Sequence, residues 1–189
     1  MVTKRKVLIT GANGQLGSAL KYLSVSYNNK YFFSTKKDLD ITDFPSVLYF
    51  LQKHKIDTII NCAALTDVKF CESNPSLADE VNNKAVQNMA ELCSKLNKQL
   101  IHISTDYVFD GNKKSPYLVT DKTNPINNYG LSKLGGENGI LKYNLRNSAI
   151  IRTSWLYSDS DNNFVSKIIK KIKNKEDLNV VNDEMGSPT

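Results

Sequence analysis

Three glycines at positions 11, 14 and 17 follow a short apolar run and constrain the fold of this chain most strongly. The segment from Lys6 to Gly17 reads KVLITGANGQLG. We expect a buried strand, a tight turn and a helix start, because glycine allows a turn without a Cβ and a close approach of helix to strand. Amides at such a helix start face a pyrophosphate. The alternative is a turn that only joins two elements, since the GxxGxxG spacing is wider than the commonest dinucleotide fingerprint.

Composition narrows the classes of protein that fit. The 189 residues are 40% hydrophobic, enough for one large domain with a core. The net charge of +6 comes from lysines spread along the chain without an aromatic-basic RNA-binding motif, so no nucleic-acid partner is predicted, and an anionic small substrate accounts for the charge equally well. Three cysteines without a CxxC pair favour a reducing, cytoplasmic compartment. No apolar run suits a signal peptide or a membrane helix, and neither a membrane partner nor a metal site is predicted.

Apolar runs alternate with helical patterns, which predicts an α/β fold. Strands are expected at 6–10, 31–35, 58–61, 100–104, 148–152 and 178–181. Helices are expected at 15–26, 45–54, 75–97, 129–143 and 163–175. The alternation indicates a doubly wound, Rossmann-like parallel sheet with helices on both faces.

Two segments carry separate expectations. The helix at 163–175 has an apolar face and is expected to cover the sheet, with a membrane-surface or partner helix as the alternative. The segment 107–128 is long, irregular and rich in turn residues, and it is expected to be functional.

Candidate catalytic groups follow the expected fourth strand. Ligands of a doubly wound sheet lie outside the carboxyl ends of the strands, where residues 104–106 place two hydroxyls and a carboxylate. Tyr129 and Lys133 share a helix face. A nearby ammonium would lower the pKa of the phenol and make an acid/base unit. A second pair at the same spacing, Tyr49 and Lys53, is interpreted as accidental, because no such strand end precedes it.

Six motifs together resemble the extended short-chain dehydrogenase/reductase superfamily and, within it, the dTDP-4-dehydrorhamnose reductase family. They are TGANGQLG at 10–17, NCAALTDV at 61–68, STDYVFDG at 104–111, YGLSK at 129–133, RTSWLY at 152–157 and NDEMGSPT at 182–189. The resemblance implies NAD(P)H-dependent reduction of the 4-keto group of a dTDP-4-dehydro-6-deoxyhexose to dTDP-L-rhamnose, with a dTDP-sugar as substrate.

The resemblance also implies roles for individual residues. Thr105 would orient the substrate carbonyl, Tyr129 would donate the proton, and Lys133 would hold the nicotinamide ribose and the phenol. The implied cofactor-binding residues are Gly11, Gly14, Gln15, Leu16, Gly17, Lys36, Asp40, Ile41, Ala63, Ala64, Leu65, Tyr129 and Lys133. The implied substrate-binding residues are Thr105, Asp106 and Trp155. Asp106 is equally an ordinary turn former, and Trp155 equally a core aromatic.

Lysines at the end of the second expected strand favour NADPH. An acidic residue there accepts the ribose hydroxyls of NADH, whereas cations receive a 2′-phosphate. The strand is followed by Lys36 and Lys37. NADH stays open as the cofactor because Asp38 and Asp40 are close by.

The resemblance also implies a two-part chain and leaves other functions to be weighed. Residues 1–181 would form the dinucleotide-binding domain, and 182–189 would begin a substrate-binding region that the family continues further, so a truncated chain is expected. A noncatalytic NADP-binding regulatory subunit, resembling that of methionine adenosyltransferase, is the alternative function. An epimerase or dehydratase ranks lower, because the acid follows Thr105 as Asp106. The oligomeric state stays open, with a homodimer among the options.

Overall fold

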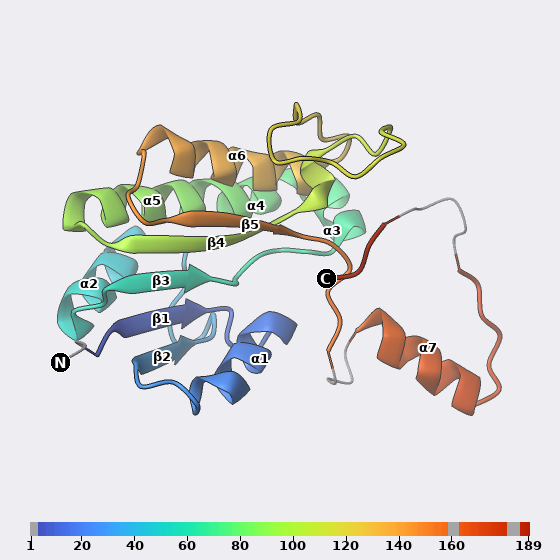
Figure 1. The fold of residues 1–189 in the computed structure, drawn as a ribbon, viewed down its shortest axis with the longest axis horizontal. Helices are drawn as coiled ribbons and strands as arrows, with labels where there is room; N and C mark the ends of the chain where they lie inside the picture. The colour runs from blue at the N-terminus through green and yellow to red at the C-terminus, as the bar shows by residue number, and fades with distance from the viewer. Residues whose placement is uncertain (1–3, 159–162, 181–185) are drawn as a thin grey trace.

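A computed structural model describes residues 4–158, 163–180 and 186–189. The described strands form one parallel sheet in the order β2-β1-β3-β4-β5 (Figure 1). The strands are β1 Lys6–Thr10, β2 Lys30–Ser34, β3 Thr58–Asn61, β4 Gln99–Thr105 and β5 Ala149–Thr153. The α-helices are α1 Gln15–Ser24, α2 Phe44–His54, α3 Val68–Ser73, α4 Pro75–Asp79, α5 Ala85–Leu96, α6 Asn128–Lys142 and α7 Phe164–Lys173.

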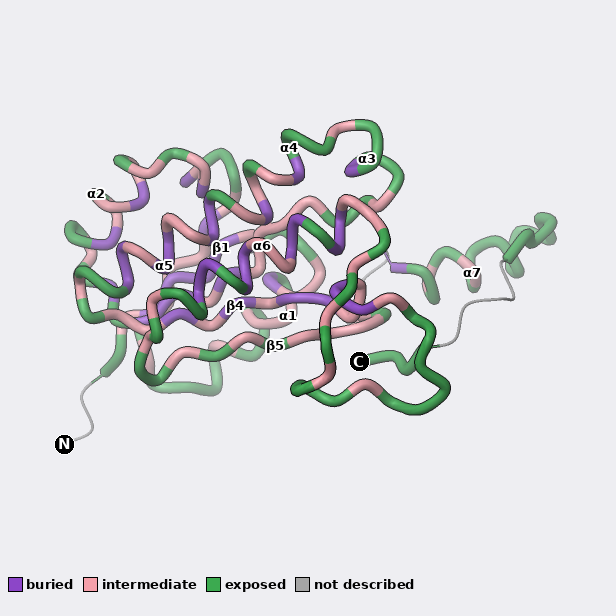
Figure 2. Tube along the Cα trace, turned by 90° about the horizontal axis from the view of Figure 1, so that it is seen from above, coloured by how far each residue is buried: buried purple, intermediate pink, exposed green. Residues whose placement is uncertain are grey.

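The direction of the crossovers reverses after β2, which makes the sheet doubly wound. The chain passes from β1 to β2 in one direction and from β2 through β3 and β4 to β5 in the other. Right-handed crossovers therefore place α1 on one face and α2, α5 and α6 on the opposite face. Figure 2 shows α2, α5 and α6 side by side on that face. The predicted fold class is confirmed.

The main core lies between the sheet and the face that carries α2, α5 and α6. Leu8, Ile59 and Leu100 come from neighbouring strands and are almost fully buried. They pack against Leu51 of α2 and Met89 of α5 in the same cluster. Alternation along each strand sends these side chains to one face, so the carboxyl ends of β1, β3 and β4 are held side by side.

The predicted elements differ from the observed ones in three places. Helix α3 was not predicted, and the helix expected over 75–97 contains a π-helical turn, η1 Glu80–Lys84, between α4 and α5. The sixth strand expected over 178–181 is absent from residues 178–180, which are exposed, and Val181 lies outside the described residues. Of the expected region 182–189, only 186–189 are described, so the division at 181 stays a prediction.

Helix α7 does not cover the sheet, so that expectation was wrong. It lies beyond the carboxyl ends of the strands (Figure 1), and none of its residues is buried. Phe164 is 65% exposed. The backbone turns away from the sheet at Trp155, where φ is +45°.

Among the described residues, no helix combines the length and apolar character needed to cross a bilayer.

The edge strand β5 is held to α6 by an ion pair between a buried carboxylate and a half-buried guanidinium. The Nε atom of Arg152 donates to a carboxylate oxygen of Glu137 at 2.9 Å, and its Nη2 atom donates to the other oxygen. The hydroxyl of Ser104 in β4 donates to the same carboxylate. Glu137 is almost fully buried, so these three bonds replace its lost hydration.

We predict that Glu137→Ala lowers the free energy of unfolding by about 3 kcal/mol, because it leaves Arg152 and Ser104 without their shared acceptor. Urea denaturation measures the loss. Lys95→Ala is the control, since it removes the exposed pair with Glu91 and should change stability by less than about 0.5 kcal/mol. A similar small effect of Glu137→Ala would show that the ion pair does not hold β5.

Candidate active site

The glycine turn between β1 and α1 lies where the strand order reverses. Gly11 has a φ of +64°, and a Cβ on it would lie 2.7 Å from the backbone nitrogen of Ala63. A Cβ on Gly17 would lie 2.4 Å from the carbonyl oxygen of Gly11. Only glycine fits at either position without a backbone shift. The turn therefore packs backbone to backbone against the segment that follows β3.

The first turn of α1 offers its amides to an anion. Gly14 is the N-cap residue, and within this described helix no side chain caps the amides and no acidic residue lies in the first turn. Gln15 and Leu16 begin the helix and are half-buried. The backbone nitrogen of Ala12 donates to the carbonyl oxygen of Ser34 at 3.1 Å, which ties the turn to the end of β2. This arrangement can hold a phosphate group.

The residues after β2 separate into a surface group and a core residue. Lys36 is exposed, and its Nζ atom lies 3.7 Å from a carboxylate oxygen of Asp40. Asp40 also accepts hydrogen bonds from the backbone and hydroxyl of Thr42, and these, with the charge of Lys36, lower its pKa against an opposing effect of burial. Ile41 is buried in the main core. Its side chain therefore serves packing, and only its backbone is available to a ligand.

The segment after β3 is fixed by a buried asparagine of the π-helical turn. Ala63, Ala64 and Leu65 are half-buried beside the glycine turn. The side chain of Asn82 accepts from the Leu65 nitrogen and donates to the Leu65 oxygen, each at 2.9 Å. It also donates to the hydroxyl of Ser132 in α6 at 3.1 Å. Asn82 thus joins this segment to the helix that carries the candidate catalytic pair.

Thr105 and Tyr129 meet at the carboxyl end of β4. Both are buried, and the Thr105 side chain lies near enough to the Tyr129 phenol to lower its pKa. The close approach depends on Gly130, where a Cβ would lie 2.1 Å from the carbonyl oxygen of Tyr107. Asn127 caps α6 by accepting from the Gly130 nitrogen at 2.7 Å. The start of α6 is therefore packed directly on the 3-10 turn η2 Asp106–Val108.

The pKa of Tyr129 is raised, contrary to the expectation from its pairing with Lys133. Burial is the largest cause, and the side chain of Thr105 opposes it; the charge of Asp106 adds to the rise. The expectation assumed that the ammonium faces the phenol. Instead the Nζ atom of Lys133 donates to the carbonyl oxygen of Ile103 at 2.7 Å. The phenol therefore stays protonated at neutral pH and can donate a proton.

Lys133 is fully enclosed under the site, with 2% of its surface exposed. Burial lowers the pKa of its ammonium to about 8, and the carboxylate of Glu137 opposes that shift. Its second polar neighbour is His102 of β4, whose Nε2 atom lies 3.2 Å from Nζ. Sequence patterns alone did not single out His102.

The second Tyr-Lys pair lies on the surface, as expected. Tyr49 of α2 is 60% exposed, and the Nζ atom of Lys53 lies 5.2 Å from the centre of its ring. Neither residue lies at the carboxyl end of a strand. The spacing of four residues is therefore not sufficient to build a site.

Asp106 and Trp155 lie at the outer side of the site. Asp106 opens the turn η2 and accepts a hydrogen bond from the hydroxyl of Ser154 at 2.6 Å, so it is a turn former and a polar group of the site edge at once. Trp155 is 46% exposed, which rules out the core alternative. A Cβ on Gly186 would lie 3.0 Å from the indole ring. The nitrogen of Thr189 donates to the carbonyl oxygen of Ser154 at 2.9 Å.

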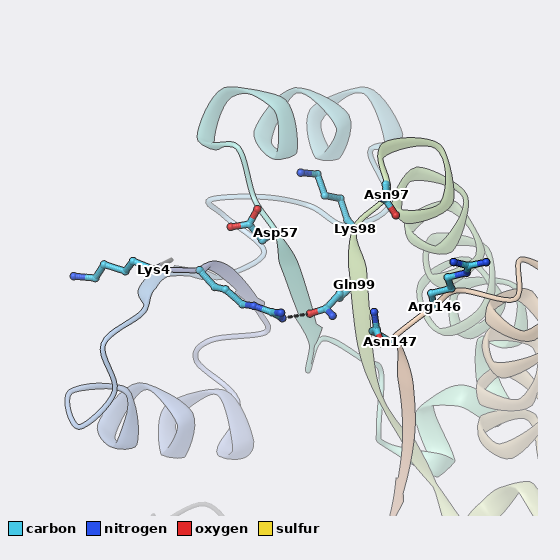
Figure 3. Close-up of a pocket in the computed structure, with 8 residues that line it drawn as sticks. Lys4, Asp57, Asn97, Lys98, Gln99, Arg146 and Asn147 are labelled. Atoms are coloured by element: carbon cyan, nitrogen blue, oxygen red, sulfur yellow. Dashed lines mark hydrogen bonds between the residues drawn. The ribbon is translucent and has the colours of Figure 1, made fainter. Parts of the chain in front are cut away.

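A basic concavity of about 400 Å³ lies at the opposite end of the sheet. Figure 3 shows its polar side chains, among them Lys4, Lys98 and Arg146. Asn97, which also lines it, is the left-handed C-cap of α5. A helix C-terminus repels anions, and the ligands of such sheets bind at the carboxyl ends of the strands. The concavity is therefore not the candidate active site.

In the described ranges, no group of three or more His, Cys, Asp or Glu side chains is arranged to hold a metal ion.

A sequence profile of the family described as the RmlD substrate binding domain matches residues 5–189. The chain belongs to this family.

Two named reductases and one solved structure are similar to the chain over nearly its whole length. The dTDP-4-keto-6-deoxy-D-glucose reductase of Streptomyces niveus is 40% identical over 182 residues, which are 96% of this chain and 63% of that protein. The dTDP-4-dehydrorhamnose reductase of Aggregatibacter actinomycetemcomitans is 41% identical, over 97% of this chain and 63% of that protein. The dTDP-4-dehydrorhamnose reductase of Bacillus anthracis, solved in complex with NADP, superposes with a TM-score of 0.94 at 39% identity, over 100% of this chain and 67% of that one. The chain thus spans about 63% of the length of the curated relatives it matches.

Sequence reasoning missed the buried polar residues that support the site. They are Asn61, Asn82, His102 and Glu137. Asn61 and His102 do carry a signal, because each interrupts an apolar strand, and a polar group buried in a sheet needs a partner. Asn82 and Glu137 lie in helical patterns that look like ordinary amphipathic helices.

We predict that Gly130→Ala destabilises the protein by about 1–3 kcal/mol, because its Cβ would displace α6 from the Tyr107 backbone. Urea denaturation measures the change. Leu131→Ala alters the exposed neighbouring residue and should cost less than about 0.5 kcal/mol. Equal stability of the two variants would contradict the close contact.

Proposed function

We propose that this chain supplies the cofactor-binding and proton-donating part of an NADPH-dependent reductase that acts on the 4-keto group of a dTDP-4-dehydro-6-deoxyhexose. The observation that carries the proposal is the meeting of Thr105 and the protonated phenol of Tyr129 at the carboxyl end of β4. The glycine turn lies at the end of β1, two strands away. The named relatives are reductases, so the regulatory-subunit alternative is not favoured.

The residues around the glycine turn fit a dinucleotide. A Cβ at Gly11 or Gly17 would fill the space that lets the turn pack closely, and the uncapped first turn of α1 presents free amides to a pyrophosphate. Lys36 is available for a 2′-phosphate, because its exposed ion pair with Asp40 is weak. NADPH, when bound, supplies the hydride for the ketone.

The residues of the chain account for the proton. Reduction leaves negative charge on the former carbonyl oxygen, and a hydroxyl donor at that oxygen stabilises it. Thr105 would orient the carbonyl by a hydrogen bond, and Tyr129 would transfer its phenolic proton to the oxygen. The raised pKa of Tyr129 favours this direction, because the phenol remains protonated before the reaction. Asp106 and Trp155 would border the sugar nucleotide, and a cytoplasmic homodimer stays a prediction.

The proposal is tested by NADPH oxidation with dTDP-4-dehydro-6-deoxy-L-lyxo-hexose, using this chain and a version lengthened with the C-terminal remainder of a relative. We expect NADPH binding by both and turnover by the lengthened version, in which Tyr129→Phe lowers kcat by about 10²- to 10⁴-fold. The Kd for NADPH should stay close to its original value, because the variant removes one hydroxyl and little volume.

Tyr49→Phe is the matched control, since Tyr49 also precedes a lysine by four residues but lies on the surface. It should leave kcat and the Kd for NADPH unchanged. Unchanged turnover in Tyr129→Phe would remove Tyr129 from the mechanism. Absence of turnover in both versions would reject this substrate.

We also predict that Lys36→Glu weakens NADPH binding relative to NADH by about tenfold, because it replaces a cation near the 2′-phosphate with a carboxylate. The Kd values of both cofactors at low salt give the ratio. Lys170→Glu makes the same charge change on α7 and should leave the ratio unaltered. Tighter binding of NADH than of NADPH by the unaltered chain would overturn the assignment.

A further inference from the structure

Four buried polar side chains form a continuous chain across the sheet, directly beneath the candidate site. The hydroxyl of Thr10, which ends β1, donates to Asn61 Oδ1 at 2.6 Å. Asn61 Nδ2 lies 3.1 Å from His102 Nδ1, and His102 Nε2 lies 3.2 Å from the Nζ atom of Lys133. Each of the four is at most 2% exposed. The residue before the glycine turn is therefore connected to the candidate catalytic lysine.

The orientation of the Asn61 amide is fixed by a backbone group. The nitrogen of Ala63 donates to Asn61 Oδ1 at 3.3 Å. A backbone N–H is always a donor, so the oxygen of the amide must face Ala63. The NH₂ group of Asn61 must then face His102.

This orientation determines the tautomer of His102. The Nδ1 atom of His102 faces a group that can only donate, so Nδ1 accepts and carries no proton. Burial lowers the pKa of His102 well below its usual value, so the ring is neutral. A neutral imidazole without a proton on Nδ1 carries it on Nε2.

The Nε2–H group of His102 then points at Lys133. An ammonium has three donors and no acceptor, so a charged Lys133 would set two donors against each other at 3.2 Å. A neutral amine can accept from Nε2–H while it donates to the carbonyl oxygen of Ile103. Only this arrangement pairs every polar group of the chain, and within the described residues no buried side-chain nitrogen or oxygen lacks a partner.

We propose that His102 is a positioning residue which, held by Asn61 as the Nε2–H tautomer, donates to Lys133 and keeps it a neutral amine until the cofactor is bound. The proposal rests on the proposed reductase function for its role in cofactor binding, but the tautomer and the charge are properties of the protein alone.

The other groups around Lys133 are consistent with this state. Burial lowers its pKa to about 8, so little is needed to remove the proton near neutral pH. Cys62, after β3, has its pKa raised to about 12 by burial, and its thiol is uncharged. Glu137, one turn later on α6, favours the ammonium but is already bound to Arg152. Tyr129, one turn earlier, is a protonated phenol.

A bound dinucleotide would shift Lys133 from the neutral amine to the ammonium. Its negative charge and ribose hydroxyls favour an ammonium, so binding should draw a proton to Lys133. The role expected for Lys133, holding the ribose and the phenol, would thus begin only when the cofactor is in place.

The tautomer is tested by nitrogen NMR of the unaltered protein labelled at histidine, without cofactor or substrate. The chain has two histidines, and His54→Gln identifies the signals of His102. We expect a protonated Nε2, an unprotonated Nδ1 and no change between about pH 6 and about pH 9. A protonated Nδ1 in the unaltered protein would overturn the proposal, and this result needs no variant of the buried chain to fold.

Asn61→Asp tests the effect on Lys133. The near-isosteric carboxylate can still accept from Thr10 and Ala63, but its second oxygen accepts from Nδ1–H, which moves the histidine proton and lets Nε2 accept from an ammonium. Carbon NMR of labelled lysine should show the protonation equilibrium of Lys133 shifted at least about tenfold toward the ammonium, one pKa unit. His54→Gln is the control and should not shift it. An unchanged titration of Lys133 in Asn61→Asp would reject the proposal.

Calorimetry of NADPH binding in two buffers of different ionisation enthalpy measures the proton taken up. We expect uptake already between about pH 7 and about pH 8 in the unaltered chain, where Lys133 is neutral before binding, and its loss in Asn61→Asp. NADPH binding without proton uptake would reject the proposed protonation of Lys133 on cofactor binding. Failure to oxidise NADPH with the sugar nucleotide would count against the proposed function and leave the histidine and lysine measurements in force.

Discussion

The contact between the turn at Gly11 and the backbone at Cys62 and Ala63 is the constraint on which the site depends. It brings the loops after β1 and β3 within van der Waals distance at the place where the strand order reverses. A side chain at Gly11 would separate them. The buried hydrogen bond between Thr10 and Asn61 lies one residue before this contact in both strands. The glycine turn and the buried polar chain under the site are therefore held in place by the same pair of strands.

Two kinds of polar contact stabilise the elements around this support. At the edge of the sheet, Glu137 and Arg152 join α6 to β5 through charged groups that keep their hydrogen bonds in a buried setting. In the centre, Asn61, His102 and Lys133 are joined by hydrogen bonds, and both His102 and Lys133 are uncharged in the proposed state. The first arrangement favours rigidity. The second leaves one proton free to be gained or lost beside the reacting groups, which suits a site that binds an anionic dinucleotide.

The sequence was sufficient for the features that local chemistry determines. The places of the five strands of the sheet to within a residue or two, the glycine turn and the end of β4 followed from apolar runs and glycine spacing, and the Tyr49 pair was correctly set aside. The remaining features depend on distant partners. The apolar face of α7 looked like a sheet-covering face, yet its packing depends on where the backbone leads after Trp155. The raised pKa of Tyr129 depends on burial and on the direction of the Lys133 side chain, neither of which spacing reveals.

The π-helical turn at Glu80–Lys84 makes the length of this helix part of the site. A regular α-helix advances about 100° per residue, and a π turn contains one residue more than the α-helical turn it replaces. Deleting a single residue there would restore a regular helix and rotate α4 relative to α5, taking Asn82 away from the Leu65 backbone. Side chains on the outer surface of this helix can therefore be exchanged freely, whereas a change of one residue in its length would break the hydrogen bonds that hold the loop after β3.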